Sequence, residues 1–456
     1  MEQDTRVEID QTLLDRLLRL PLGEGAYHAV ERLEDAGFEA WWVGGGVRDL
    51  LLEQLPTEID IATNAKPEAV ATLFPKSDTS AAALGAAVIA VKGSMFEVTT
   101  FREESDTIEG RAPTAVKFVD RLTDAKRRDF TVNAIYFHPL RRTIDDPTGG
   151  TSDLHERLVR FIGEPSVRIT HDPLRLLRAV RLRANIDGQY HPETFQALSQ
   201  KATEIKRLSG SRCFEELQKI LVGKGPDRAL EDLWEFKILQ EILPELARCK
   251  GIAQPADFHR EGDVWEHMLL CLRAFTEDHG IDVRLAALFH DCGKAETFSL
   301  SDRIRFNEHA SVSRDLTVAA LKRMQCPRQR TDKIGWLVGH HMTLGEFIDM
   351  ESEPKARWYY HPWFTELLQL FWLDIQGTEP ADTSGYDRLL DDYNHFLDSH
   401  PRPPKPLLGG DEVMEILGLK PGERVGELLQ QLEAAQLRKE VTTRAEAQEF
   451  LKRIAK

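Results

Sequence analysis

The chain has 456 residues, with 59 basic and 75 acidic side chains and a formal net charge of −16. This length is sufficient for about two to four domains of ordinary size, and the hydrophobic content of 41% supports packed cores. No run of 18 apolar residues is present, which excludes a transmembrane helix of the usual kind.

The first twenty residues carry too many charges to form the apolar segment of a signal peptide, so we expect a cytoplasmic protein with no membrane partner. The five cysteines are scattered and include no CxxC pair, which predicts buried free thiols rather than disulfides or a zinc ribbon. The net charge opposes nucleic-acid binding, but residues 121–219 carry 18 basic against 13 acidic side chains. A basic surface on an acidic protein is therefore compatible with the composition.

The first predicted elements are a strand, a glycine turn and a helix. The segment GFEAWWVGGG begins at Gly37, and VRDLLLEQL follows it with helical spacing of apolar residues. Such a corner also occurs in ordinary folds, but it lets backbone N–H groups approach phosphates. Further strands are expected at 58–62, 87–91, 96–101, 116–118 and 131–137. These predict an α+β domain built on one small sheet over the first 150 residues.

Two carboxylates, Glu58 and Asp60, have the spacing that places side chains on one face of a strand. Carboxylate oxygens at a fixed separation can hold Mg²⁺ for phosphoryl transfer, although a solvated strand face is the commoner reason for such a pair. A third carboxylate could come from Glu97 in FEVTTFR or from Asp129 in KRRDFTVNA.

After DPTGG at 146–150 the strand signals disappear, and the remaining sequence predicts an α-helical assembly almost to the end. Within it, histidines and aspartates recur as His267, the pair His290-Asp291, His309, His340 with His341, and Asp374. Imidazole and carboxylate together suit divalent transition metals, and an aspartate bridging two metals is one route to phosphoester hydrolysis.

These five elements resemble the HD superfamily of metal-dependent phosphohydrolases. The resemblance implies a metal site whose ligands we assign as His267, His290, Asp291, His309, His340 and Asp374, with Ni²⁺, Mn²⁺ or Co²⁺ bound. Lys294 in HDCGK is expected near a phosphate. The alternative is a helical scaffold that has lost this chemistry.

The N-terminal motifs resemble the class II tRNA nucleotidyltransferases, which are the CCA-adding enzymes and their relatives the bacterial poly(A) polymerases. The resemblance is carried by VGGGVRD at 43–49, IDIATNAKPE from Ile59, RRDFTVNA at 127–134, GEPSVRITHDPLRLLRAVR at 163–181 and the stretch 407–437. It extends from about residue 28 to the C-terminus.

The resemblance implies a polymerase-β-like head at 25–160, a helical neck at 161–250, an HD-type helical domain at 251–400 and a helical tail at 401–456. It implies Mg²⁺ at Glu58 and Asp60, with Glu97 and Asp129 as further catalytic candidates. Nucleotide contacts are implied for Gly45, Gly46, Arg48, Arg127, Arg128, Asn133, Asp172, Arg175 and Arg178. Of these, Asp172 and Arg175 would read the base of CTP or ATP, because they keep an acceptor and a forked donor.

The sequence departs from the family pattern at positions next to the expected chemistry. Glu58 stands where the family has the first aspartate of Asp-x-Asp, and His171 stands where the base-reading motif has glutamate. Leu84-Gly85-Ala86 replaces the usual His-Gly-Thr.

The leading hypothesis is a tRNA nucleotidyltransferase that adds CCA, or part of it, to the tRNA 3′ acceptor end from CTP and ATP, with an additional HD phosphohydrolase activity. The alternatives are an enzyme adding only CC or only A, a poly(A) polymerase, and an HD phosphohydrolase whose N-terminal domain positions RNA. A further alternative is an RNA-binding protein without catalysis.

Overall fold

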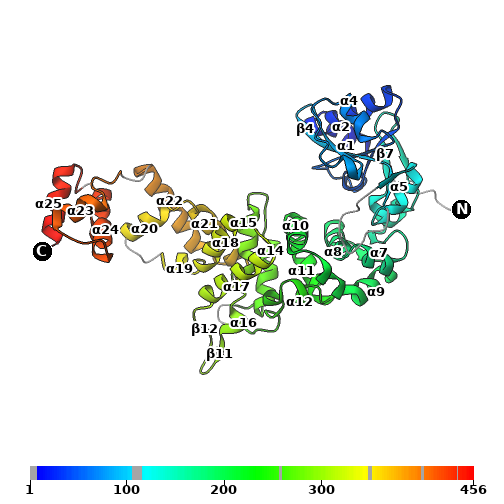
Figure 1. Ribbon diagram of the computed structural model, residues 1–456. Helices are drawn as coiled ribbons and strands as arrows, with labels where there is room; N and C mark the ends of the chain where they lie inside the picture. The colour runs from blue at the N-terminus through cyan, green and yellow to red at the C-terminus, as the bar shows by residue number, and fades with distance from the viewer. Residues whose placement is uncertain are drawn as a thin grey trace. The chain divides into compact units, whose positions relative to one another are not determined.

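A computed structural model describes residues 8–104, 116–255, 259–347, 352–401, 405–438 and 440–455 (Figure 1). The chain forms two compact units. The first comprises Met1–Lys250 with Ala319–Arg328, and the second comprises Gly251–Val318 with Gln329–Lys456. The first unit contains a mixed sheet and the second is mainly helical, so the predicted α+β class is confirmed.

The head of the first unit is built on a six-stranded sheet with the order β3-β4-β2-β1-β7-β8. Neighbouring strands are antiparallel except β2 and β4, which run parallel. The strands are β1 (Ala40–Val43), β2 (Asp60–Thr63), β3 (Ala86–Val91), β4 (Ser94–Thr100), β7 (Tyr136–His138) and β8 (Thr143–Asp145).

The two faces of this sheet differ in polarity because side chains alternate along β4. Phe96 and Val98 are buried, whereas Glu97 is exposed on the opposite face. Helix α2 (Pro21–Asp35) covers the buried face, where Gly25 lies so close to the Phe96 ring that an added Cβ would be 2.9 Å from it. The face that carries Glu97 remains available for polar chemistry.

Two predicted strands have different bounds in the structure, and a third has the predicted bounds but lies outside the main sheet. The strand expected at 58–62 begins at Asp60, so Glu58 belongs to the preceding segment. The stretch 131–137 starts as a single 3-10 turn at Thr131–Asn133 and enters the sheet only at β7. The strand at 116–118 is β6 (Val116–Phe118), which pairs with β5 (Arg102–Glu104) outside the main sheet. Local propensity identified strand-forming residues but not their pairing partners.

The rest of the first unit is mainly helical. The head contains α3 (Gly45–Leu51), α4 (Pro67–Leu73) and α5 (Arg121–Arg127), and beyond it lie α7 (Pro165–His171), α8 (Leu174–Ile186), α10 (Gly210–Val222) and α11 (Pro226–Glu235). Helix α7 begins where the Glu164 carboxylate accepts the backbone N–H groups of Ser166 and Val167. Helix α8 ends at Asp187, which adopts a left-handed conformation.

In the second unit, helix α14 (Val264–Arg273) packs against α15 (Ile281–Phe289), and both pack against α21 (Phe364–Gln376). Helices α17 (His309–Arg323) and α18 (Arg328–Gly339) lie between α15 and α21 in the sequence. A hairpin of β11 (Phe298–Leu300) and β12 (Ile304–Phe306) interrupts the helices, which the sequence analysis did not predict.

The last three helices, α23 (Gly410–Leu417), α24 (Glu423–Leu437) and α25 (Arg444–Ile454), form a core around Leu428 and Leu451. Within the part of the chain that the structure describes, no helix combines the length and apolarity needed to cross a bilayer.

Candidate active site and metal centre

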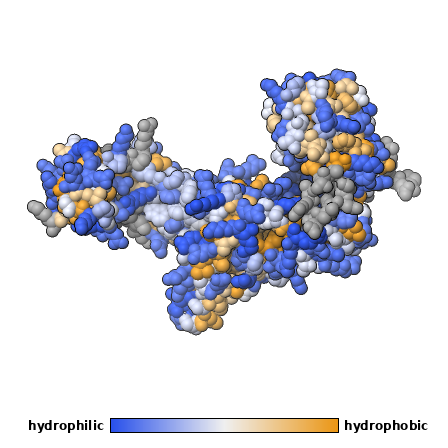
Figure 2. All heavy atoms as spheres, viewed as in Figure 1, coloured by the Kyte–Doolittle hydropathy of each residue, from blue (hydrophilic) through white to orange (hydrophobic). Residues whose placement is uncertain are grey.

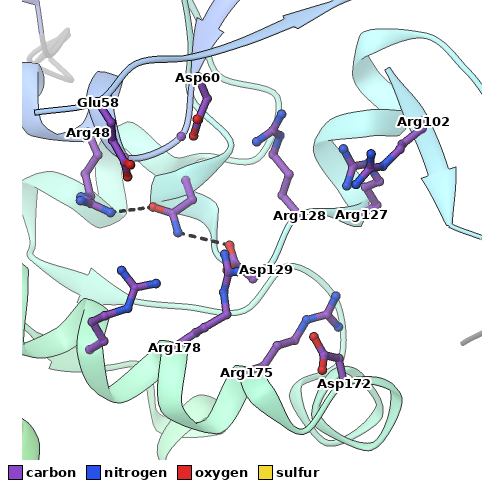
Figure 3. Close-up of a pocket in the computed structure, with 14 residues that line it drawn as sticks. Arg48, Glu58, Asp60, Arg102, Arg127, Arg128, Asp129, Asp172, Arg175 and Arg178 are labelled. Atoms are coloured by element: carbon purple, nitrogen blue, oxygen red, sulfur yellow. Dashed lines mark hydrogen bonds and ion pairs between the residues drawn. The ribbon is translucent and has the colours of Figure 1, made fainter. Parts of the chain in front are cut away.

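The head contains a cavity of about 340 Å³ that gathers charged side chains from the strand ends and from α8. Glu58 and Asp60 direct their carboxylates into the same space (Figure 3). The parallel register places Ile61 beside Val98, so the preceding residues, Asp60 and Glu97, are neighbours on adjacent strands. Glu58 and Asp60 therefore share the cavity, and Glu97 lies close enough to Asp60 to affect its charge.

The electrostatics of Asp60 reflect this crowding. Burial and the negative charges of Glu58 and Glu97 raise the pKa of Asp60 from its usual 3.8 to about 6, while Arg128 and Arg178 offset part of the rise. A cation bound among the carboxylates would remove the repulsion. Since all the donors are carboxylate oxygens, the set fits Mg²⁺.

A glycine corner brings α3 against these carboxylates. Gly44 has φ of +80°, and a Cβ added there would lie 3.1 Å from Asp60 Oδ2. Gly45 lines the cavity as predicted for a nucleotide-contacting backbone. Gly46 is different, because its added Cβ would lie 2.6 Å from the Glu58 carbonyl oxygen. This close packing leaves no room for a side chain at Gly46, whose predicted nucleotide contact stays a prediction, and Gly44 also lines the cavity.

A hydrogen-bonded chain connects Arg48 to Arg178 across the cavity. Arg48 Nη1 donates to Asn133 Oδ1 at 3.0 Å, and Asn133 Nδ2 donates to Asp129 Oδ1 at 3.2 Å. Arg178 Nη2 lies 2.6 Å from Asp129 Oδ2. Burial acts to raise the pKa of Asp129, but Arg178, Asn133 and the Phe130 N–H lower it to about 2.

Both oxygens of Asp129 are thus engaged with protein donors, and a metal would have to displace these contacts. Glu97 lies beside Asp60 in the register but does not line the cavity, so Glu97 and Asp129 both remain candidates for the third carboxylate of a magnesium site. Asp129 holds the guanidinium of Arg178 at the cavity wall (Figure 3).

Two further arginines are held by Asp124, which the sequence analysis did not single out. Arg127 Nη2 lies 2.7 Å from Asp124 Oδ1, and Arg128 Nη2 lies 3.1 Å from Asp124 Oδ2. Tyr136 Oη donates to the same Oδ2 at 2.8 Å. Burial opposes ionisation, but the two arginines outweigh it and lower the pKa of Asp124. The spacing of three and four residues on α5 was the available sequence signal.

The pair predicted to read the base lies at the opposite wall. Asp172 Oδ1 accepts from Arg212 Nη2 at 3.1 Å, and Arg175 Nη1 donates to the Arg168 carbonyl oxygen at 3.0 Å. Arg168 in turn donates to the Arg128 carbonyl oxygen at 2.6 Å, which ties α7 to the arginine pair of α5. His171 is exposed and does not line the cavity.

The cavity is therefore lined by seven arginines and four carboxylates. The arginines are Arg48, Arg102, Arg127, Arg128, Arg175, Arg178 and Arg181, of which Arg102 and Arg181 were not predicted. Guanidinium groups bind phosphate oxygens through paired hydrogen bonds. The composition of the walls suits a triphosphate accompanied by a divalent cation.

The second unit contains a separate cluster of histidines and aspartates. Four imidazoles each place Nδ1 within hydrogen-bonding distance of a backbone carbonyl oxygen, at 2.7–3.0 Å, so that Nε2 faces the cluster; these are His267, His290, His309 and His341. Such contacts fix the tautomer and the orientation of metal-binding histidines.

The cluster divides into two groups that share Asp291. His267 Nε2 lies 3.1 Å from His290 Nε2, and both lie within 3.4 Å of Asp374 Oδ1. Asp291 Oδ2 faces this group at 3.4–3.6 Å, and its Oδ1 faces His309 and His341 at 3.4–3.6 Å. Ligands of one transition metal are spaced by about 3 to 3.5 Å, so the donor set fits two metals bridged by one carboxylate.

His340 was predicted as a ligand, and this assignment is corrected to His341. The His340 ring packs on Trp336 at 4.6 Å between ring centroids, and its Nδ1 bonds the Trp336 carbonyl oxygen. His341 Nε2 instead lies 3.2 Å from His309 Nε2. The HH dipeptide follows α18, and helical geometry sends successive side chains in different directions.

Glu261 and Cys271 contact the cluster without having been predicted there, whereas Lys294 was expected nearby. Glu261 contacts His267 Nδ1 at 3.5 Å and His259 Nδ1 at 2.6 Å. Cys271, expected only as a buried thiol, has Sγ 3.6 Å from His267 Nε2. Lys294 Nζ, expected near a phosphate, lies 2.7 Å from Asp291 Oδ2.

The pKa of His290 is raised to about 10. Burial disfavours its imidazolium form, but Asp291 and Asp374 outweigh this effect, so metal binding at His290 must displace a proton.

Comparison with known protein families gives three matches along the chain. Residues 40–160 match the poly A polymerase head domain, residues 189–250 match a probable RNA and SrmB-binding site of polymerase A, and residues 264–362 match the HD domain.

An A-adding tRNA nucleotidyltransferase of Deinococcus radiodurans is 34% identical over 351 residues, covering 73% of this chain and 79% of that protein. A CCA-adding enzyme of Geobacillus stearothermophilus is 40% identical over 228 residues, and there the chain spans 56% of the relative's length. The crystal structure of a Bacillus stearothermophilus CCA-adding enzyme in complex with CTP superposes with a TM-score of 0.69, at 27% identity and over 96% of this chain and 98% of that one.

Together with the cavity of the head, these similarities define a nucleotidyltransferase. The chain belongs to the family of tRNA nucleotidyltransferases and poly(A) polymerases, and it carries an HD domain. Both domains imply the use of divalent metals.

We expect Mg²⁺ binding in the head to strengthen as the pH rises through about 6, because Asp60 must lose its proton. Below this value the affinity should fall by up to about tenfold per pH unit. Isothermal titration calorimetry with Mg²⁺ across this range measures the effect, and Asp60→Asn should bind weakly at every pH. An affinity for Mg²⁺ that stays constant across this range would contradict the prediction.

We expect His341→Ala to lower the bound transition metal by about one equivalent relative to the unsubstituted protein, because one of the two groups would lose a ligand. His340→Ala is the matched control, since it removes an adjacent imidazole that faces Trp336, and it should leave metal content unchanged. Elemental analysis of the purified proteins after dialysis gives the comparison. Equal losses in the two variants would show that His341 is not a ligand.

Proposed function

We propose that the head transfers nucleotides from CTP and ATP to the 3′ end of tRNA and so builds the CCA terminus or its last part. The observation that carries this proposal is the convergence of Glu58 and Asp60 with seven arginines in one cavity at a glycine corner. A nucleoside triphosphate with bound Mg²⁺ matches both sets of charges, because the cation balances the carboxylates and the phosphates balance the arginines. Membership in the tRNA nucleotidyltransferase family supports the choice of an RNA 3′ end as acceptor.

In this proposal Glu58, Asp60 and Glu97 hold Mg²⁺, which supplies charge neutralisation for the triphosphate. The arginines held by Asp124 and Asp129 bind the phosphate oxygens. The RNA 3′-hydroxyl oxygen attacks the α-phosphorus, forming one P–O bond as the bond to pyrophosphate breaks. The hydroxyl proton is released to solvent, and pyrophosphate leaves along the arginine-lined wall.

Asp172 and Arg175 select the base. Asp172 offers acceptor oxygens, and Arg175 offers donors whose orientation is set by the Arg168 carbonyl oxygen. Arg212 Nη2 lies 3.1 Å from Asp172 Oδ1 and holds this carboxylate in place. His171 occupies the position of the family's glutamate, is exposed and does not line the cavity, so the proposal assigns base selection to Asp172 and Arg175.

A second candidate is addition of the terminal A alone. It is favoured by the A-adding enzyme of Deinococcus radiodurans, which aligns with 73% of this chain. The same active site serves both reactions, and the distinction lies in which tRNA end is accepted.

We also propose that the HD domain hydrolyses phosphoesters at RNA ends, either terminal phosphates or 2′,3′-cyclic phosphates, with Ni²⁺, Mn²⁺ or Co²⁺ held by two groups around Asp291. The support is the paired donor set and the nearby Lys294. Water attacks the phosphorus of a cyclic ester, one ring P–O bond breaks, and the freed sugar oxygen takes a proton. The bound metals would lower the pKa of the attacking water.

We expect Asp60→Asn to lower nucleotide incorporation by at least about a hundredfold, because the substitution removes a ligand from a preorganised electrostatic site. The measurement uses tRNA transcripts that end before CCA, after C or after CC, with labelled CTP and ATP supplied separately. Extension of the last transcript alone identifies an A-adding enzyme.

Asp35→Asn on α2 is the control, since it makes the same change of charge on an exposed position outside the cavity. Neither variant should unfold at a lower temperature than the unsubstituted protein, and Asp60→Asn should unfold at a higher one near neutral pH because it removes a buried, repelled charge. Full incorporation by a folded Asp60→Asn protein would remove Asp60 from the catalytic site.

We expect Asp291→Asn to abolish metal-dependent hydrolysis of 2′,3′-cyclic nucleotides while preserving tRNA extension, because Asp291 is the one carboxylate that faces both metal groups. Asp60→Asn should show the reverse pattern, so the two variants control each other. Hydrolysis is followed by chromatography after loading with Mn²⁺, Ni²⁺ or Co²⁺. A metal-loaded protein that hydrolyses no phosphoester would overturn the HD proposal.

A further inference from the structure

A cavity of about 600 Å³ opens beside the metal-binding cluster. One part of its wall consists of the proposed ligands Asp291, His309, His341 and Asp374. Another part is apolar and is contributed by Ile304 and Phe306 of β12, by Met342 and by Ile375. An ester whose phosphate lies at the metals would therefore place its organic group against apolar side chains.

Phe306 occupies the border between these two parts of the wall. Its ring lies 5.4 Å from Lys294 Nζ and 6.5 Å from the His309 ring, measured to the ring centroid. Lys294 contacts Asp291 and His309 belongs to the cluster. The Phe306 ring is therefore close enough to the metal-binding cluster for the base of a nucleotide to reach it when the phosphate of that nucleotide lies at the cluster. A flat group of the size of a base could stack on it.

The apolar wall continues out of the cavity along the β11–β12 hairpin. The register pairs Phe298 with Phe306 and Leu300 with Ile304. Cross-strand partners point to the same face of a hairpin, so these four side chains form one apolar surface. The rings of Phe298 and Phe306 lie 6.0 Å apart.

The outer half of this surface is exposed. Phe298 retains 39% and Leu300 70% of their possible exposure, and neither lines the cavity. Apolar residues follow the hairpin in the surface view (Figure 2). A contiguous exposed apolar surface next to a polar centre is typical of a binding site rather than of a free surface. Arg303 lies in the turn of the same hairpin, whereas Arg305 is the cross-strand partner of Ser299 and pairs with Asp302 at 2.9 Å.

We propose that the HD cavity and the hairpin bind the 3′ end of single-stranded RNA over at least two nucleotides, with the last base on Phe306 and the preceding base on Phe298 and Leu300. Single-stranded nucleic acids are bound in this way, by stacking on aromatic side chains next to cationic groups. RNA is favoured over a peptide because the chain belongs to the tRNA nucleotidyltransferase family and because its residues 189–250 match an RNA-binding family model.

This inference rests on the phosphoester hydrolysis proposed for the HD domain and adds a preference for substrate length. The bond that breaks is the same ring P–O bond of a terminal 2′,3′-cyclic phosphate, with water supplying the new oxygen and the proton. A mononucleotide occupies only the Phe306 position, whereas an oligonucleotide occupies both.

The test compares kcat/KM of the full-length, Mn²⁺-loaded protein for a 2′,3′-cyclic mononucleotide and for a tetranucleotide with the same terminal group. We expect the tetranucleotide to be preferred by about tenfold, within the range that one stacked base contributes. Phe298→Ala should remove this preference and leave the mononucleotide reaction unchanged. Phe306→Ala should slow both reactions, and Phe306→Trp should restore them.

Ser299→Ala is the matched control, because Ser299 lies between Phe298 and Leu300 on the other face of β11. It should keep the preference for the tetranucleotide. Equal kcat/KM for the two substrates in the unsubstituted protein, or an intact preference in Phe298→Ala, would overturn the proposal.

A binding measurement separates this inference from the hydrolysis on which it rests. Fluorescence anisotropy with a labelled tetranucleotide reports binding when no hydrolysis occurs. If the metal-loaded protein cleaves neither substrate, a loss of binding in Phe298→Ala but not in Ser299→Ala still supports the RNA surface. Unchanged binding in both variants would then reject the surface along with the hydrolysis.

Discussion

The repulsion among Glu58, Asp60 and Glu97 is the constraint on which the arrangement of the head depends. Burial, together with the negative charges of Glu58 and Glu97, raises the pKa of Asp60 to about 6, which is a cost to the folded state when Asp60 is ionised. The protein offsets the cost only in part through Arg128 and Arg178. The remaining negative charge makes the space beside these carboxylates a site for a divalent cation. The glycine corner carries no side chain that would fill this space.

The arginines face the complementary problem. Seven guanidinium groups around one cavity repel each other. A guanidinium group that is held in one orientation needs a hydrogen-bond acceptor such as a carboxylate. Asp124 holds Arg127 and Arg128, whereas Asp129 holds Arg178 and, through Asn133, is linked to Arg48. Asp124 and Asp129 use their oxygens for this purpose, so a metal would bind them only by displacing these contacts. The head thus divides its carboxylates into those that orient arginines and those that face a cation.

The sequence was informative where chemistry depends on residues close together in the chain. The glycine corner, the pair Glu58 and Asp60, and the arginines next to Asp129 could all be identified from local spacing. The choice between Glu97 and Asp129 could not, because it depends on the parallel pairing of β2 with β4 and on the contact of Asp129 with Arg178.

The HD domain illustrates the same limit. The sequence indicated a histidine at the end of α18 but not which imidazole of the HH pair faces Asp291, since one residue changes the direction of a side chain by a large angle on a helix. The structure selects His341. The β11–β12 hairpin was missed because its strands have only three residues each, and their pairing is visible only in three dimensions.

The two proposed activities are linked by the chemistry of the RNA end. Nucleotidyl transfer requires a free 3′-hydroxyl, which a terminal phosphate or a 2′,3′-cyclic phosphate blocks. Hydrolysis of a cyclic end yields one free hydroxyl and a monoester, and removal of the monoester yields the second hydroxyl. A chain that carries both centres could therefore act on a blocked end and then extend it. In that sequence of reactions the product of the Asp291 centre is the acceptor that the Asp60 centre needs, and the hairpin would favour RNA over free nucleotides for the first step.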